Sequence, residues 1–173
     1  AVRFVTYLKG LAARDRGAMA ALRRSLGRPP GSDPAVYPVV ERFVPDGHDL
    51  DARRRALYLI AGLFALHPVQ ADGVSLARAF GRLMLQRQSD SVEKRFIALL
   101  SVDDDQLPNF LRQAVTLLAA DHIGLDYAAL LDDAGVWMRP WASEARDRVR
   151  QRWARDFYRA VAVAAEDESA SAD

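Results

Sequence analysis

Apolar residues recur at every third or fourth position along most of the chain, which is the spacing of one face of an α-helix. In RFVTYLKGLAA (3–13), for example, Phe4, Tyr7, Leu8 and Leu11 share one face. The alternation of apolar and polar residues that marks a half-buried strand is nowhere sustained. The pattern predicts about nine helices and no strand, with the helices at 3–13, 16–27, 33–44, 49–67, 75–87, 89–101, 106–122 and 126–138 and a long last helix from Ser143.

Residues typical of helix ends support these boundaries. Asp33 is suited to the position before a helix, and Pro34 to the first helical position. Pro38 lies inside the same segment and predicts a short or kinked helix, because proline lacks the N–H that the helix needs. The fifth helix starts at Ser75, and Ser89 or Asp90 is the better cap for the sixth.

The connections between the predicted helices are short, which favours antiparallel neighbours. The polar stretch QRQSD (86–90) is a plausible division between two groups of helices. We therefore predict an all-α fold of about nine helices in two small helical bundles, residues 1–88 and 89–165. The acidic tail EDESASAD (166–173) is predicted to be disordered, since it has almost no apolar side chain to bury.

The composition allows a substantial core and excludes several classes of protein. Half of the 173 residues are hydrophobic, enough for one domain or two small ones. The absence of cysteine excludes disulfides, a thiol nucleophile and thiolate metal sites. The longest apolar run, ALYLIAGLFAL (56–66), is shorter than the roughly 18 residues of a membrane span. These features predict a cytoplasmic protein without a membrane contact.

No set of residues with catalytic or metal-binding spacing is visible. His48, His67 and His122 each lie beside a helix end or turn, where a structural role is the expected one. The run of acids at 103–105 precedes a helix, and capping with dipole complementarity explains it. No nucleotide-binding glycine loop or nucleophile motif occurs. We expect no enzyme activity, no bound metal and no cofactor.

The charge pattern points to an anionic partner. The net charge of +1 includes a tail with four acids and no bases, so residues 1–165 carry 24 bases against 19 acids. Of the bases, 22 are arginine, whose planar guanidinium binds phosphate at two points. A GC-rich genome would also enrich arginine and alanine codons, so the excess alone does not decide the function.

Several arginines stand where an ordinary soluble helix would not place them. Arg53 to Arg55 open the fourth helix, where positive charge opposes the helix dipole, so acids nearby or an anionic partner are needed; Asp49 and Asp51 supply part of this. Arg146 and Arg150 fall in or beside the apolar face of the last helix. A buried charge needs a partner, so either an acidic side chain reaches them or the helix end meets a bound anion.

The remaining clusters could converge on one surface after folding. Arg23 and Arg24 belong to a basic segment that runs from Lys9 to Arg28, and Arg78, Arg95 and Arg112 lie on three further helices. A basic track of this kind binds the phosphate backbone without reading sequence. Trp137, Trp141 and Trp153 have core spacing, so base stacking is not the expected mode.

Several phrases, taken in order, resemble the CasB family. They are RDRGAMAALRRSLGR (14–28), LFALHP (63–68), SLARAFGRLM (75–84), SVEKRFIALLSVDDDQLPNFLRQAVTLL (91–118), LDYAALLDDAGVWM (125–138) and VRQRWARDFYR (149–159). The resemblance covers residues 3–160. It implies an all-helical, non-catalytic small subunit of the type I-E CRISPR Cascade surveillance complex, present in two copies.

The resemblance also implies the partners. These are the backbone and large subunits of Cascade, a second copy of the chain, the displaced single DNA strand and the guide RNA–DNA duplex. The implied nucleic-acid-binding residues are Arg23, Arg24, Arg53, Arg54, Arg55, Arg78, Arg95, Arg112, Arg146 and Arg150. The alternative is an all-helical protein–protein adaptor, which would show a contiguous apolar patch and no salt-dependent binding of nucleic acid.

Overall fold

Helices make up almost all of the computed structural model, which describes residues 1–47 and 51–170, and side chains as far as residue 163. Within these residues there is no strand, and Gln70 and Leu125 form a single isolated β-bridge. The all-α prediction is therefore confirmed. The α-helices are α1 (Val2–Arg14), α2 (Arg16–Ser25), α3 (Tyr37–Val40), α4 (Asp51–Leu66), α5 (Leu76–Arg87), α6 (Asp90–Leu100), α7 (Leu107–Ala120), α8 (Tyr127–Trp137) and α9 (Ser143–Ala170).

The helix starts follow the predicted caps. The side chain of Ser75 accepts a hydrogen bond from the Arg78 amide, and that of Ser89 accepts one from the Ser91 amide. The segment 33–44 is broken as Pro38 predicts, into two 3₁₀ turns, Pro34–Val36 and Glu41–Phe43, on either side of the four-residue α3.

The last helix is longer than predicted. It continues to Ala170, so residues 166–170 are helical where the sequence predicts a disordered tail. Neither glycine nor proline occurs after Ser143, and alanine and glutamate favour helix, so nothing in the local sequence ends α9 earlier. The rest of the predicted tail, residues 171–173, lies outside the described residues.

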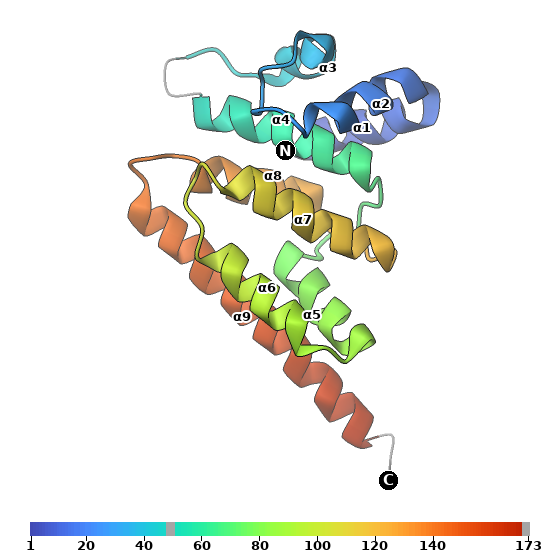
Figure 1. Ribbon diagram of the computed structural model, residues 1–173, viewed down its shortest axis with the longest axis vertical. Coiled ribbons are helices and arrows are strands. Elements are labelled where there is room, and N and C mark those ends of the chain that lie inside the picture. The colour runs from blue at the N-terminus through green and yellow to red at the C-terminus, as the bar shows by residue number, and fades with distance from the viewer. Residues whose placement is uncertain (48–50, 171–173) are drawn as a thin grey trace.

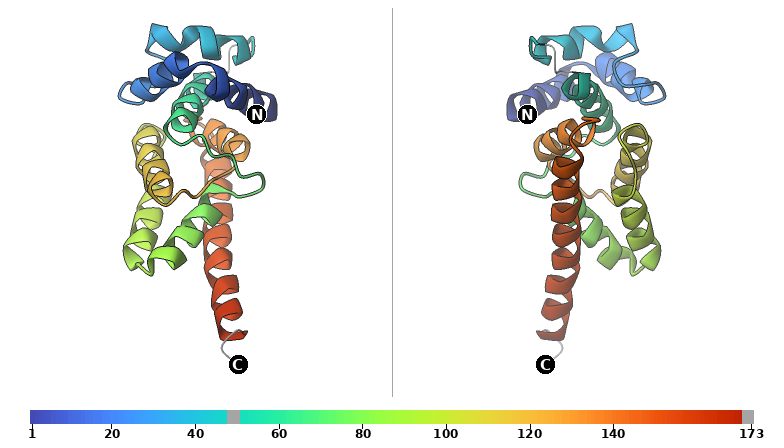
Figure 2. Two further views of the ribbon diagram at one scale, coloured as in Figure 1. Left: turned by 90° about the vertical axis from the view of Figure 1, so that its right-hand side faces the viewer. Right: turned by 90° about the vertical axis from the view of Figure 1, so that its left-hand side faces the viewer.

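The helices form an upper and a lower group (Figures 1 and 2). The upper group consists of α1 to α4, with α7 and α8 beneath them, and the lower group consists of α5 and α6, which lie along the long α9. Almost every residue of α4 from Ala56 to Ala65 is buried, because it packs against α2, α7 and α8. It is the central helix of the upper group.

The contact between α5 and α9 is unusually close. A Cβ atom on Gly81 of α5 would lie 2.8 Å from the Cβ of Ala160 and 3.1 Å from the carbonyl oxygen of Phe157. Only glycine allows this approach without displacing one helix. As a result α5, which the predicted boundary assigns to the N-terminal bundle, packs against C-terminal helices. One hydrophobic cluster contains residues of both halves, and the division at residue 88 stays a prediction.

The tryptophans show where periodicity succeeds and where it fails. Trp137 and Trp153 are fully buried, with ring centroids 5.2 Å apart, as their spacing predicts. Trp141 is 70% exposed, so its predicted place in the core is wrong. It lies in the turn between α8 and α9, where helical spacing no longer determines which way a side chain points.

The described histidines have surroundings that suit structural roles. His67 at the end of α4 is buried, and its Nε2 lies 2.8 Å from the carbonyl oxygen of Ile123. His122 is exposed in a turn, and His48 lies outside the described residues. In the described part of the chain, no three His, Asp or Glu residues are placed to hold a metal ion. None of its helices is long and apolar enough to cross a membrane.

Candidate nucleic-acid interface

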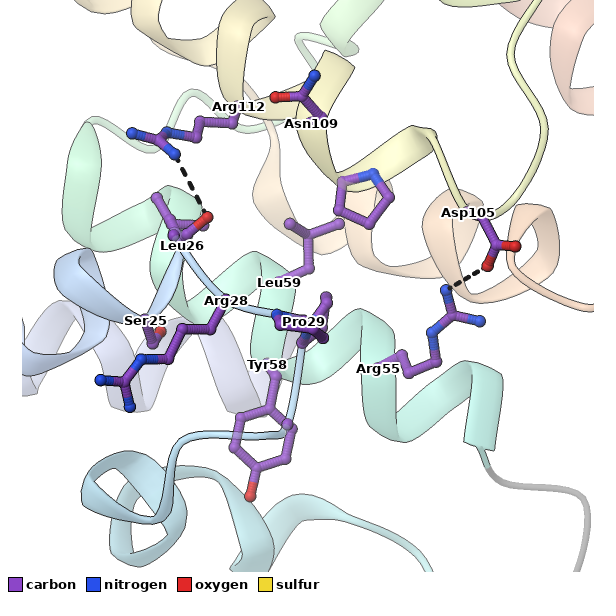
Figure 3. A pocket seen from close by; sticks show the side chains of 14 residues that line it. Ser25, Leu26, Arg28, Pro29, Arg55, Tyr58, Leu59, Asp105, Asn109 and Arg112 are labelled. Atoms are coloured by element: carbon purple, nitrogen blue, oxygen red, sulfur yellow. Dashed lines mark hydrogen bonds and ion pairs between the residues drawn. The ribbon is translucent and has the colours of Figure 1, made fainter.

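A basic cleft lies where the loop after α2 meets α4 and α7 (Figure 3). We call it the α2–α7 cleft. Its volume is about 750 Å³, and it is lined by residues 25–31, by Arg55, Tyr58 and Leu59 of α4, by Asp105, and by Pro108, Asn109 and Arg112 of α7. It gathers side chains that are far apart in the sequence.

The loop that forms one wall is held tightly against α4. Gly31 has φ of +86°, and a Cβ there would lie 3.2 Å from the Tyr58 ring. Its carbonyl oxygen accepts a hydrogen bond from the Tyr37 hydroxyl at 3.1 Å. Pro29 and Pro30 precede it and restrict the backbone further. The wall is therefore preorganised by the chain itself.

Three arginines from three segments surround this cleft. Arg28 is 62% exposed and lies 3.5 Å from Asp33. Arg112 reaches back from α7 and donates to the carbonyl oxygen of Leu26 at 3.5 Å, and Arg55 turns toward Asp105 at 3.5 Å, as Figure 3 shows. Arg55 also lies 3.8 Å from Asp104, whose side chain is 21% exposed. The Asp105 side chain is 88% exposed, so its ion pair is weak. An incoming phosphate can replace such a partner.

The end of α2 adds two more predicted cations, which differ in their surroundings. Arg23 donates from Nε to the carbonyl oxygen of Ala65 at 3.1 Å, which caps the end of α4. Arg24 is exposed, and no described residue forms an ion pair or hydrogen bond with its side chain. Arg24 lies two residues before Leu26, whose carbonyl oxygen accepts from Arg112, but it does not line the α2–α7 cleft.

The structure separates the three arginines that open α4. Arg53 pairs with Asp132 of α8 at 2.8 Å, whereas Arg54 donates two hydrogen bonds to Glu41 and lies 4.9 Å from the centre of the Tyr58 ring. Only Arg55 lines the α2–α7 cleft. The acids that offset the unfavourable helix dipole thus come mainly from distant segments rather than from Asp51.

The Arg54–Glu41 pair belongs to a small hydrogen-bonded group. The Tyr58 hydroxyl donates to the same Glu41 oxygen at 2.5 Å. This hydrogen bond, followed by Arg54, holds the pKa of Glu41 below its ordinary value of 4.5, although partial burial opposes the change. Burial and the nearby carboxylate raise the pKa of Tyr58, so its hydroxyl keeps its proton as a donor.

We expect Tyr58→Phe to lower the free energy of unfolding by about 1 kcal/mol at pH 7, since Glu41 is partly exposed and the bond is screened. A carboxyl with a lowered folded-state pKa adds stability above its unfolded value of 4.5 and loses it as pH falls through the folded value. The stability lost in Tyr58→Phe should therefore be smaller at pH 3.

Urea denaturation of the wild type and the variant at pH 7 and pH 3 measures this loss. Tyr37→Phe, which loses only a bond to a backbone carbonyl, should show no such dependence; equal dependence in both would contradict the assignment.

Arg78 and Arg95 lie on the lower group of helices and do not line the α2–α7 cleft. Arg78 donates to the carbonyl oxygen of Gly73 at 3.3 Å and lies 4.0 Å from Asp156. Arg95 is exposed on α6, beside a small apolar pocket of about 130 Å³ that includes Phe80 and Phe110. These two predicted site residues are thus separated from Arg55 and Arg112.

Arg146 and Arg150 are held mainly by backbone oxygens. Arg150 donates to the carbonyl oxygen of Val102 at 2.7 Å, pairs with Asp147 at 3.1 Å and lies 5.1 Å from the centre of the Trp137 ring. Arg146 donates to the carbonyl oxygen of Arg139 at 3.2 Å. The sequence suggested an acidic side chain or a bound anion as the partner of these two arginines. Asp147 is such an acid for Arg150, but the backbone carbonyl oxygens that accept from both were not considered.

Of the arginines that line the α2–α7 cleft, Arg28 is the one that was not among the predicted nucleic-acid-binding residues. The sequence does contain a signal for it, because it ends the basic segment that begins at Lys9. It lies beyond the predicted helix, next to Pro29, so the sequence could not predict that its side chain meets those of Arg55 and Arg112. A loop side chain has no periodicity from which its direction can be derived.

Comparison with known proteins identifies the family. The family model described as CRISPR-associated protein Cse2 matches residues 18–158. The chain is 43% identical over 166 residues to CRISPR-associated protein Cse2 of Thermus thermophilus, covering 92% of this chain and 90% of that protein. The crystal structure of CasB from Thermus thermophilus matches with a TM-score of 0.76 at 43% identity, over 90% of this chain and 96% of that one.

A third match is a chain of a CRISPR RNA-guided surveillance complex in a pre-nicking state. It has a TM-score of 0.82 at 25% identity and covers 96% of each chain. The family match extends over most of the chain, and the close relatives share its whole helical core. The chain therefore belongs to the CasB (Cse2) family of CRISPR-associated proteins, the family of Cascade small subunits.

Proposed function

We propose that this protein is a non-catalytic small subunit of a type I-E Cascade complex that holds a nucleic-acid backbone in the α2–α7 cleft. The preferred ligand is the displaced DNA strand, with the guide RNA–target duplex as a second one. The guide RNA–DNA duplex is about as stable as the DNA duplex that it replaces. Holding the displaced DNA strand would therefore shift this nearly balanced exchange toward the open state, in which the guide is paired with its target.

The observation that carries the proposal is the convergence of Arg28, Arg55 and Arg112 on one cleft. The exposed Arg24 is next in sequence to Ser25, the first residue of its lining. Arg28 now pairs with Asp33 at 3.5 Å, and Arg55 pairs with Asp104 at 3.8 Å and with Asp105 at 3.5 Å. Arg112 makes only a long contact, 3.5 Å, to the carbonyl oxygen of Leu26. A phosphate offers a charged, bidentate acceptor, which binds arginine more strongly than the neutral carbonyl oxygen that Arg112 contacts.

The chemistry of the cleft suits binding that ignores base sequence. Guanidinium groups recognise phosphate, which is the same at every nucleotide, and phosphate contacts position a strand without specifying it. In Cascade the guide supplies sequence recognition by base pairing, so a subunit that reads only charge and shape is sufficient.

The likeness to a chain of a surveillance complex supports the proposed partners. These are the backbone and large subunits of Cascade and a second copy of the chain. Assembly would also raise the effective concentration of the cleft near the strand, so the isolated chain needs only weak affinity.

Salt dependence tests the proposal directly. If the four arginines neutralise four phosphates, the logarithm of the binding constant for a single strand should fall with the logarithm of salt concentration with a slope of about −3. Fluorescence anisotropy of a labelled mixed-sequence strand, titrated at several salt concentrations, measures this slope. Strands of unrelated sequence should give the same value.

The adaptor alternative predicts a different result. An adaptor would show no strand binding even at low salt, together with unimpaired association with its protein partners. The apolar pocket beside Arg95 and the exposed Ile97 on α6 are the features of the described surface that such a partner would use. That outcome would overturn the proposal while leaving the family assignment intact.

A further inference from the structure

Trp141 stands apart from the other tryptophans of the chain. Trp137 and Trp153 are fully buried, whereas 70% of Trp141 is exposed. An exposed indole offers its flat face to a ligand, and aromatic rings favour offset stacking on other rings. Base stacking was not expected from the sequence only because all three rings had core spacing.

A second cleft joins Trp141 to the α2–α7 cleft. Its volume is about 360 Å³, and its lining residues are Asp51, Ala52, Arg54, Arg55, Met138, Pro140 and Trp141. Arg55 lines both clefts, so the two clefts are neighbours. Together the two linings contain Arg28, Arg54, Arg55 and Arg112 against Asp51 and Asp105. Three of these arginines also have acidic partners: Asp33 for Arg28, Glu41 for Arg54, and Asp104 with Asp105 for Arg55.

From this arrangement we infer that Trp141 stacks on an unpaired base of the strand whose backbone lies in the α2–α7 cleft. The inference rests on the proposed function and deepens it, because it adds a contact to an unpaired base, which a duplex cannot make. A base in a duplex has both faces covered by its neighbours, whereas an unpaired base can lie on an indole. Aromatic stacking accepts every base, which matches a site that ignores sequence.

The turn that carries Trp141 is anchored at both ends. The Ala142 amide donates to the carbonyl oxygen of Arg139 at 3.2 Å, and the Arg146 guanidinium donates to the same oxygen at 3.2 Å. Met138 before the turn is buried, and Pro140 fixes one backbone angle next to the indole. The proposal therefore gives Arg146 a positioning role, since it fastens the turn instead of touching the ligand.

The surroundings favour a nucleic acid over a protein partner. A protein docking site normally offers a contiguous apolar patch. None of the other exposed large apolar residues in the described part of the chain, such as Ile97 and Val69, lines the cleft beside Trp141. Arg54 and Arg55 line it beside Trp141. Because Glu41 holds Arg54, Arg55 is the cation that would contact a phosphate next to the stacked base.

The experiment compares three probes of equal length: a mixed-sequence single strand, its duplex, and an abasic strand with the same phosphates. Each is titrated by anisotropy against the wild type, Trp141→Ala and Trp141→Phe. Trp141→Ala should weaken binding of the normal single strand roughly tenfold, and Trp141→Phe should keep most of the affinity. Binding of the duplex and of the abasic strand should not change, and the salt slope should stay the same.

Tryptophan fluorescence provides an independent readout. The single strand should quench the emission of the wild type and leave that of Trp141→Ala unchanged, because Trp137 and Trp153 are shielded. An equal loss of affinity for the normal and the abasic strand would overturn the stacking inference. So would unchanged strand binding by Trp141→Ala, including the case in which that variant loses association with other subunits instead.

These outcomes separate the inference from the proposed function. Strand binding that depends on salt but not on Trp141 would refute stacking and leave the cleft as the binding site. Absence of strand binding by the wild type would refute both.

Discussion

Trp153→Ala is expected to lower the free energy of unfolding by about 4 kcal/mol, the typical cost of truncating a buried tryptophan. Trp153 is 1% exposed, packs against Trp137 of α8, and donates from Nε1 to Asp133 at 2.6 Å. Truncation would therefore leave a large cavity between α8 and α9 and remove one partner of a carboxylate that also pairs with Arg152. Urea denaturation followed by circular dichroism measures the change.

Trp141→Ala is the matched control, because it removes the same side chain from an exposed position. Its free energy of unfolding should stay within about 0.5 kcal/mol of the wild type. If the two variants lost equal stability, the packing of α9 on α8 through Trp153 would be wrong. The same control establishes that any loss of strand binding by Trp141→Ala does not come from unfolding.

The triple variant Arg28→Gln, Arg55→Gln and Arg112→Gln is expected to weaken single-strand binding about a hundredfold near 0.1 M salt. This corresponds to about 1 kcal/mol for each exposed charge-assisted contact, a value reduced for solvent screening. The salt slope should become shallower by about 2, since three phosphates lose their cations. Glutamine keeps part of the side-chain length, so the cleft retains its shape.

The matched control removes three charges elsewhere. Lys9, Arg16 and Lys94 are exposed on α1, the start of α2, and α6, and none of them lines either cleft. Changing all three to glutamine alters the net charge equally, and strand binding should fall less than threefold. An equal loss in both triple variants would show that overall charge, not the α2–α7 cleft, attracts the strand.

The helices were predictable because their information is local. Phe4, Leu8 and Leu11 are buried on one face of α1 at the predicted spacing. Ser75 accepts the hydrogen bond that a cap accepts, and Pro38 breaks its segment as a missing N–H requires. Each of these outcomes depends on residues within about one turn of one another.

The candidate site was only partly predictable. The sequence placed Arg55 and Arg112 among the predicted binding residues, but it grouped them with Arg78 and Arg95, which lie on the lower helices. The distribution of the arginines depends on partners that are distant in sequence, such as Asp132 for Arg53 and Ala65 for Arg23. Local periodicity contains no information on these pairs.

On its own, the sequence determined the all-helical fold, the family and the surplus of arginine in residues 1–165. Helical spacing, ordered motifs and composition are properties of the order of residues, so they do not depend on how the chain folds. Tertiary structure alone decided which arginines serve the fold and which face a cleft. It also decided that Trp141 lies exposed beside Arg55. The physical reason is that a buried or paired charge is defined by its three-dimensional neighbours, and those neighbours exist only once α2, α4, α7 and the turn before α9 have packed together.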